Sequence, residues 1–262
     1  MKSPFAWIAV LLVVAGAAGL YYWRSTGTTE PPPAPPVAAA PAAAPPLEPP
    51  RVLHPLPEPP ADAPAQPALA DSDSAVNDAV AGLFGRDAFG RFFYPDGLVR
   101  RFVATVDNLP RKTTAVRLMP VKPVPGVFAV TAGDGDFAAT PDNALRYRPY
   151  VVAMEAVDAK RLVATYVRLY PLFQSAYREL GYPDGYFNDR LMFAIDDLLA
   201  APDADGARLT QPKVVYEFAD AGLEQRSAGQ KIMMRMGSGN AARVKDKLRA
   251  IRRELTAQPP AS

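Results

Sequence analysis

The sequence predicts a single, mainly α-helical domain with a minor β-hairpin or strand, and three observations support this. Apolar residues recur at helical spacing through most of the chain after residue 70, most densely over residues 162–199. That stretch contains a turn of glycine, proline and aspartate at 181–185, which predicts two helices joined as a hairpin. Runs of strong β-formers are short and few. We expect the hairpin to form the centre of the core.

Composition divides the 262 residues into unequal parts. We predict a cytoplasmic tip at 1–4, one transmembrane helix at 5–23, a disordered Pro/Ala-rich linker at 24–70, the helical domain at 71–257 and a disordered tail at 258–262. The foldable part is large enough to bury one good core.

The residue types that are missing exclude several classes of function. The chain has no cysteine, and its one histidine, His54, lies in the Pro-rich stretch. Disulfides, thiolate metal sites and Ser/Cys–His catalysis are therefore not expected, and we predict neither a metal nor a cofactor. A net charge of +2 carries no bulk signal for nucleic acid, so no nucleic-acid partner is predicted.

An uncharged apolar run begins at Phe5 and ends at Trp23. It is long enough to cross a hydrocarbon core of about 30 Å as a helix. Aromatics close the run, and Lys2 before it favours a cytoplasmic N-terminus. A cleavable signal peptide is the alternative, although the bulky end of the run disfavours it. Both interpretations place the domain across the membrane. Our expectation is an inner-membrane anchor with the domain in the periplasm of a Gram-negative-type cell.

Proline is frequent and aromatics are absent between residues 28 and 67. Such a segment buries too little apolar area to fold and favours extended polyproline II. We interpret it as a spacer that carries the domain away from the bilayer. Two alternatives stay open. Its proline motifs bind a proline-recognising partner, or residues 53–57 dock back onto the domain.

The first half of the domain is predicted as helices separated by loops. A helix is expected over residues 72–84, and a second over 98–109 with Asp96 as its cap. Three prolines between residues 116 and 128 predict an extended, packed loop. Residues 127–139 then predict a small hairpin around two glycines.

Helical pattern resumes at residue 141 and continues past Pro149 to residue 157. The long helix of the hairpin is expected over residues 159–180 with Asp158 as its cap. Pro171 should kink it or split it.

The second helix of the hairpin is expected over residues 188–200, capped by Asn188. Residues 213–218 are the best isolated strand candidate. Ser227 predicts the start of a short helix, and residues 240–255 carry the apolar stripe of a last one.

Four phrases together carry a family resemblance: RRFVATVDNLP at 100–110, YPDGYFNDRL at 182–191, PKVVYEFAD at 212–220 and SAGQK at 227–231. With these phrases the chain resembles the bacterial domain-of-unknown-function family 3014, over most of residues 56–255. The resemblance implies a membrane-anchored envelope protein. It implies no activity, so no catalytic residues are carried over from it.

The densest polar group beside the hairpin is the first candidate site: Asp184, Tyr186, Asn188, Asp189 and Arg190. Aromatic faces and acids of this kind suit a shallow site for a polar ligand such as a sugar. The alternative is structural: a Pro-Asp-Gly turn, a helix cap, and an arginine paired with a buried acid.

A second candidate group comprises Arg100, Arg101, Asp107 and Asn108. Its arginines, with further basic residues at the helix end, suit an anion. Ion pairing inside the domain is the alternative interpretation.

Other motifs fail on spacing or repetition. The Gly-Asp alternation at 133–136 is a single unit without repeats, and the acids at 203–206 lack the other ligands of an EF-hand loop. The phrase at 227–231 has the wrong spacing for an S-x-x-K motif. The basic last helix suits anionic lipid or another acidic polymer, but charge runs are more often solvated faces.

The sequence thus favours a non-enzymatic, membrane-anchored binding or scaffold factor with an envelope protein or cell-wall partner. The alternative is a cell-wall glycan-binding domain or a carboxylate-dependent hydrolase that uses Asp184 and Asp189, with Glu155 or Glu217. Such hydrolysis requires two acids facing each other across a cleft, roughly 5 to 9.5 Å apart.

Overall fold

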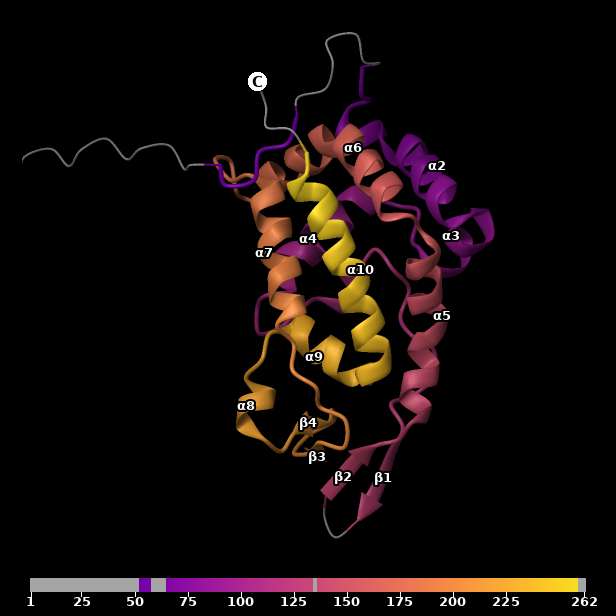
Figure 1. Ribbon diagram of the computed structural model, residues 1–262, viewed down its shortest axis with the longest axis vertical. Helices are drawn as coiled ribbons and strands as arrows, with labels where there is room; N and C mark the ends of the chain where they lie inside the picture. The colour runs from indigo at the N-terminus through magenta and orange to yellow at the C-terminus, as the bar shows by residue number, and fades with distance from the viewer. Residues whose placement is uncertain (1–51, 58–64, 134–135, 259–262) are drawn as a thin grey trace, which may run out of the picture. The chain divides into compact units, whose positions relative to one another are not determined.

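Helices dominate the domain in the computed structural model, which describes residues 52–57, 65–133 and 136–258 (Figure 1). All described residues lie in one unit of the chain, Pro49–Ser262. The predicted anchor, most of the predicted linker and nearly all of the predicted tail fall outside the described residues. Within these ranges no helix has both the length and the apolar character needed to cross a membrane.

The N-terminal elements are η1 (Leu69–Asp71), α2 (Asp73–Phe84), α3 (Arg86–Phe92) and α4 (Leu98–Asn108). Both helices predicted here are confirmed, whereas the short helix α3 was not expected.

The cap predicted for α4 is wrong. Gly97 precedes the helix with φ +63, a left-handed conformation that glycine adopts readily. Its N–H donates to the carboxylate of Asp73 in α2, and Asp96 provides no capping hydrogen bond.

The loop after α4 contains η2 (Val116–Leu118) and one isolated bridge between Phe93 and Val121. Its predicted packing is only partly correct, because Val116 and Val127 are 57% and 84% exposed. The predicted hairpin follows as β1 (Val130–Gly133) and β2 (Asp136–Ala139).

α5 (Asp142–Ala156) continues through Pro149. α6 (Ala159–Glu179) starts as predicted, since the Asp158 carboxylate accepts from the N–H of Arg161 at 2.8 Å. Pro171 does not split α6, which is one continuous helix.

α7 (Phe187–Leu199) begins one residue earlier than predicted, after Tyr186. Asn188 therefore lies inside the first turn and is not the cap. The two arms of the predicted hairpin also touch each other little. Instead α4 and α10 (Ser238–Thr256) each pack against both α6 and α7 (Figure 1). The main core is thus shared by these four helices, with α2 packed on α4 and α6.

Two short strands join the hairpin, β3 (Arg208–Thr210) and β4 (Glu217–Phe218). The antiparallel order is β1-β2-β3-β4. The strand predicted at 213–218 is wrong over its first four residues. Val214 and Val215 are 88% and 62% exposed, so their β-propensity has no packing surface to act through.

The C-terminal helices are α8 (Ala221–Glu224), α9 (Ala228–Arg235) and α10. The predicted cap of α9 is confirmed, because the hydroxyl of Ser227 accepts from the N–H of Gln230 at 3.0 Å. The helical class of the fold is therefore confirmed, and its β part is a four-stranded sheet.

Candidate functional site

The first predicted polar group lies at the start of α7 and holds residues 52–57, which we call the stalk segment. The Asp189 carboxylate accepts from the backbone N–H of Leu53 at 3.0 Å and of His54 at 2.7 Å. The side-chain amide of Asn188 donates to the carbonyl of His54 at 2.8 Å. The docking of the linker on the domain, one of the alternatives from the sequence, is thereby confirmed.

Leu56 anchors the stalk segment in the main core. Its side chain is 3% exposed, and its N–H donates to the hydroxyl of Tyr186 at 2.9 Å. Asn188 is 1% exposed and also accepts from the hydroxyl of Tyr166 at 3.1 Å. An amide suits this position because it offers a donor and an acceptor at once.

Two tyrosines beneath the stalk segment resist ionisation. Burial raises the pKa of Tyr166 well above its ordinary value, and burial likewise raises the pKa of Tyr170. Both hydroxyls therefore stay protonated at pH values near 10, where an ordinary tyrosine ionises. Tyr170 donates to Gln174 at 2.7 Å, and Gln174 in turn accepts from the N–H of Phe187 at 2.9 Å.

Asp184 stays apart from these hydrogen bonds. It lines a shallow depression of about 310 Å³ together with Tyr182, Tyr186 and Asp189. The ring of Tyr182 is stacked on Tyr177, with the ring centroids 4.5 Å apart.

Arg190 points to the second candidate group and pairs with Asp107 of α4. Its Nε lies 3.0 Å from Oδ1, as an ion pair that lacks the alignment of a hydrogen bond. Arg111 binds the other carboxylate oxygen at 2.8 Å, and the hydroxyl of Tyr182 lies 3.3 Å from it. The Asp107 carboxylate raises the pKa of Arg111. The structural alternative, an arginine paired with a buried acid, is confirmed.

The remaining members of the second group also have protein partners. Arg100 pairs with Glu179 at 3.0 Å, and both side chains are about half exposed. Arg101 donates to backbone carbonyls and stacks over Tyr94, 4.9 Å from the ring centroid. Asn108 donates to a carbonyl one turn earlier in α4 at 2.7 Å. Ion pairing and local hydrogen bonding thus account for this group better than anion binding does.

The further acids considered for hydrolysis lie elsewhere. Glu155 of α5 pairs with Arg243 of α10, and hydrogen bonding from Arg243 lowers the pKa of Glu155. Glu217 is in β4. Neither Glu155 nor Glu217 lines the depression that holds Asp184. Asp189 does line it, but its carboxylate is bound to backbone N–H groups of the stalk segment.

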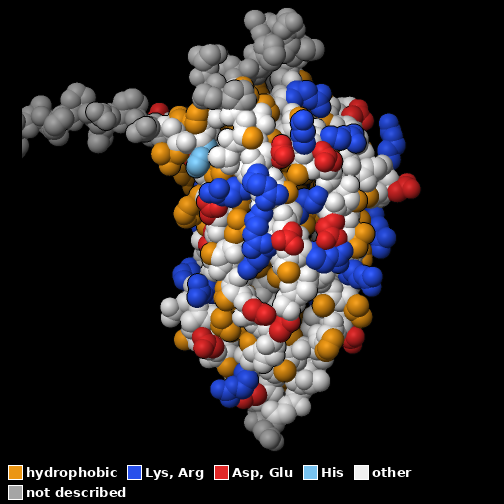
Figure 2. All heavy atoms as spheres, in the orientation of Figure 1, with side chains coloured by type: hydrophobic (Ala, Val, Ile, Leu, Met, Phe, Trp, Pro, Cys, Tyr) orange, Lys and Arg blue, Asp and Glu red, His pale blue; other side chains and the backbone are white. Residues whose placement is uncertain are grey.

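The basic face of α10 is interleaved with acids (Figure 2). Arg252 pairs with Asp196 at 2.7 Å, and Arg249 pairs with Asp246 at 2.8 Å. Lys247 donates to backbone carbonyls at the end of α5. Much of this charge therefore holds α10 to its neighbours.

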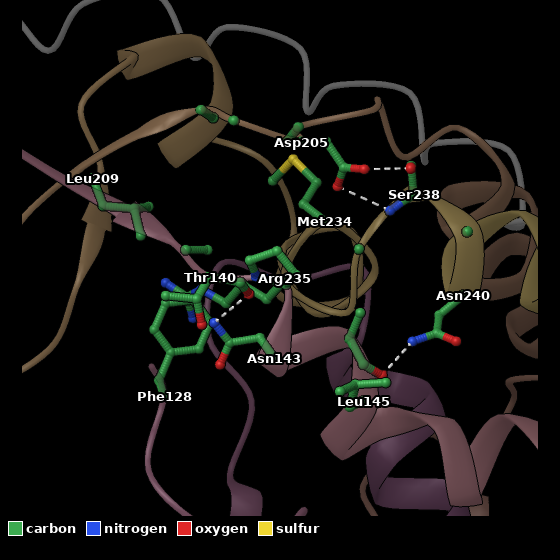
Figure 3. A pocket seen from close by; sticks show the side chains of 18 of the residues that line it. Phe128, Thr140, Asn143, Leu145, Asp205, Leu209, Met234, Arg235, Ser238 and Asn240 are labelled. Carbon is green, nitrogen blue, oxygen red and sulfur yellow. Dashed lines mark hydrogen bonds between the residues drawn. The ribbon is translucent and has the colours of Figure 1, made fainter. Parts of the chain in front are cut away.

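A pocket of about 540 Å³ lies where the sheet meets α5, α9 and α10 (Figure 3). Its polar side chains largely bind protein atoms. Asp205 accepts from the N–H of Ser238 at 3.0 Å, and Asn240 donates to the carbonyl of Ala144 at 2.8 Å. Asn143 holds the backbone of Ala129. These bonds join α10 to α5 and tie the segments that precede β1 and β3 to the helices.

A second cavity, of about 310 Å³, lies within the main core and is lined almost wholly by apolar side chains. Sequence reasoning missed it. The residues around it have ordinary helical spacing, so nothing distinguishes them from a filled core.

Comparison with known families identifies the same family as the four phrases noted in the sequence. A family profile described as "Protein of unknown function (DUF3014)" matches residues 98–252. The chain belongs to this family. The match starts at α4 and is shorter than the resemblance over most of residues 56–255 predicted, since it leaves out α2 and α3. No curated protein and no solved structure matches the chain.

Proposed function

We propose that this member of the DUF3014 family is a single-pass inner-membrane protein whose periplasmic helical domain is a binding or scaffold factor of the cell envelope. The apolar run from Phe5 to Trp23 and the Pro/Ala-rich linker support the location. The partner is a segment of another envelope protein, bound where the stalk segment docks.

One observation carries the binding role: three side chains at or just before the start of α7 bind the backbone of the stalk segment. Asp189 and Tyr186 accept from the N–H groups of the stalk segment, and Asn188 donates to one of its carbonyls. Bonds to backbone groups are largely indifferent to sequence, while the buried Leu56 supplies the side-chain specificity. A partner with an apolar residue at the same spacing fits by exchanging with the stalk segment.

The test is binding of a labelled peptide with the sequence of residues 49–57 to the purified full chain, followed by fluorescence anisotropy. We expect weak binding to the wild type, whose own segment fills the site. Leu56→Ala loosens that segment and should bind the peptide at least about tenfold more tightly. Leu56→Ala combined with Asp189→Ala should not bind.

A peptide carrying the Leu56→Ala change is the matched control and should bind to none of the three proteins. Absence of peptide binding by a folded Leu56→Ala chain would contradict the proposed binding role.

The compartment has its own test. A reporter enzyme that is active only outside the cytoplasm, fused after Ser262, should be active, and proximity labelling from the same end should mark envelope proteins. A chain recovered in the cytosol with cytoplasmic neighbours would overturn the proposed location.

A second candidate is glycan binding, favoured by the depression that Tyr182, Asp184, Tyr186 and Asp189 line. Asp184→Asn leaves the bonds to the stalk segment intact and should weaken sedimentation of the full chain with purified cell wall. The engagement of Asp189 and Glu155 with protein partners favours glycan binding over hydrolysis. Equal sedimentation of Asp184→Asn and wild type would remove this candidate.

A further inference from the structure

The apolar cavity of the main core lies between α2, α4, α6, α7 and α10. Among its lining residues, only Thr165 and Tyr166 have polar side-chain atoms. The hydroxyl of Tyr166 already donates to Asn188 at 3.1 Å. The cavity therefore offers almost nothing to a polar ligand.

Physical chemistry limits what can fill such a space. Water needs two or more polar partners, so an apolar cavity excludes it. An empty cavity destabilises the fold in proportion to its volume, and protein interiors are normally close-packed. A volume of about 310 Å³ falls at the lower end of the range, about 300 to 1,000 Å³, typical of pockets for small ligands.

The cavity approaches the surface at half-buried side chains. On α2 these are Val80 and Leu83, on α6 they are Leu162 and Thr165, and on α10 Leu248 contributes. Apolar side chains at the rim allow a hydrocarbon chain to enter without crossing a polar barrier.

Basic residues of α6 lie next in sequence to the residues at the rim. Lys160, Arg161 and Arg168 are exposed on this helix. Positions 161, 165 and 168 fall on one face of α6 at helical spacing, and Thr165 is the member of this face that lines the cavity. Guanidinium groups bind carboxylates through paired hydrogen bonds.

We propose that this cavity binds the hydrocarbon chain of a single-chain anionic amphiphile of the fatty-acid class, with its carboxylate at Arg161 and Arg168. The apolar lining selects the chain, and the guanidinium groups select the head group. This site adjoins the docking site of the stalk segment through Tyr166, but its ligand is different, so each proposal is tested by its own probe.

The test uses the purified full chain and a palmitic acid that carries a diazirine in its chain. After irradiation, cross-linked peptides are mapped by mass spectrometry, and peptides from residues 5–23 are scored separately. We expect labels on the lining positions of α2, α6 and α10. Ala194→Leu, at a lining position 2% exposed, should reduce them about tenfold.

The matched control is Ala164→Leu, the same change at an exposed position of α6, which should leave labelling unchanged. Thr165→Leu at the half-buried rim is a second filling variant, used if Ala194→Leu loses its helical circular dichroism. Replacing Arg161 and Arg168 by glutamate should reduce capture of the acid, but not of the corresponding diazirine alcohol.

Absence of labels on the lining positions would overturn the proposal. Equal labelling of both filling variants and the Ala164→Leu control would do the same, because it would show adsorption to the surface. Equal capture of acid and alcohol by the wild type, with no effect of the glutamate changes, would overturn the assignment of an anionic ligand.

Discussion

The docking site of the stalk segment and the apolar cavity lie in the same domain and teach opposite lessons. The docking site is rich in polar side chains that sequence reasoning selected, and the chain itself occupies it. The cavity is lined by residues that looked like ordinary core, and no side chain fills it. Polar residues beside a turn thus serve the fold here, while the space for a ligand arises from how helices cross.

The largest expected effect is at the ion pair between the two candidate groups. Asp107→Ala should lower the free energy of unfolding by about 3 kcal/mol, because it leaves the largely buried Arg190 without its counter-charge. Urea unfolding of the full chain measures this. Arg100→Ala, which breaks an exposed pair, should cost less than about 1 kcal/mol. Similar losses in both variants would contradict the structural role of Asp107.

The stalk segment offers a matched pair of leucines. Leu56→Ala should destabilise the domain by about 2 to 3 kcal/mol, because the side chain is 3% exposed within the core. Leu53, only three residues away, is 68% exposed, and its change to alanine should stay within about 0.5 kcal/mol. An unchanged free energy of unfolding in Leu56→Ala would show that the stalk segment is not docked.

The buried tyrosines predict an alkaline limit to stability. Their pKa values are raised in the folded state by burial, whereas the unfolded chain ionises near pH 10. Stability is therefore fully present below about pH 10 and should fall above it by about 1.4 kcal/mol per pH unit for each such tyrosine. Urea unfolding between about pH 9 and pH 11 measures the slope. Tyr166→Phe should lower it, and an unchanged slope would exclude Tyr166 as its source.

The smallest expected effect is at Asp189. Asp189→Asn keeps the size of the side chain but removes the charge from two hydrogen bonds to the stalk segment, so a loss of about 1 kcal/mol is expected. Asp184→Asn is the control, since Asp184 makes no hydrogen bond within the described residues, and should leave stability unchanged. A larger loss in the control would invert the roles assigned to these two acids.

Much of the fold was predictable because local signals govern it. Asp158 and Ser227 cap helices as their sequence positions indicate, and apolar spacing located α4, α6, α7 and α10. The failures depend on tertiary contacts. The residue before α4 is Gly97, and not the predicted Asp96, because the N–H of Gly97 donates to the carboxylate of Asp73 in α2. Only Glu217 and Phe218 of the strand predicted at 213–218 form a strand, because the exposed side chains of Val214 and Val215 have no protein surface to pack against.

The candidate site was predictable in its residues but not in its pairings. Tyr186, Asn188 and Asp189 do act together, but their partner lies more than a hundred positions earlier in the chain. Arg190 pairs with the distant Asp107 because α4 packs on α7. No local pattern contains that information.

Amide hydrogen exchange of the stalk segment in the full chain tests the central claim most directly. The N–H groups of Leu53, His54 and Leu56 donate to side chains of the domain, so their exchange should be slow. Asp189→Ala should release the first two and leave Leu56 the slowest. Exchange of all three at the rate of an unfolded peptide would contradict the account.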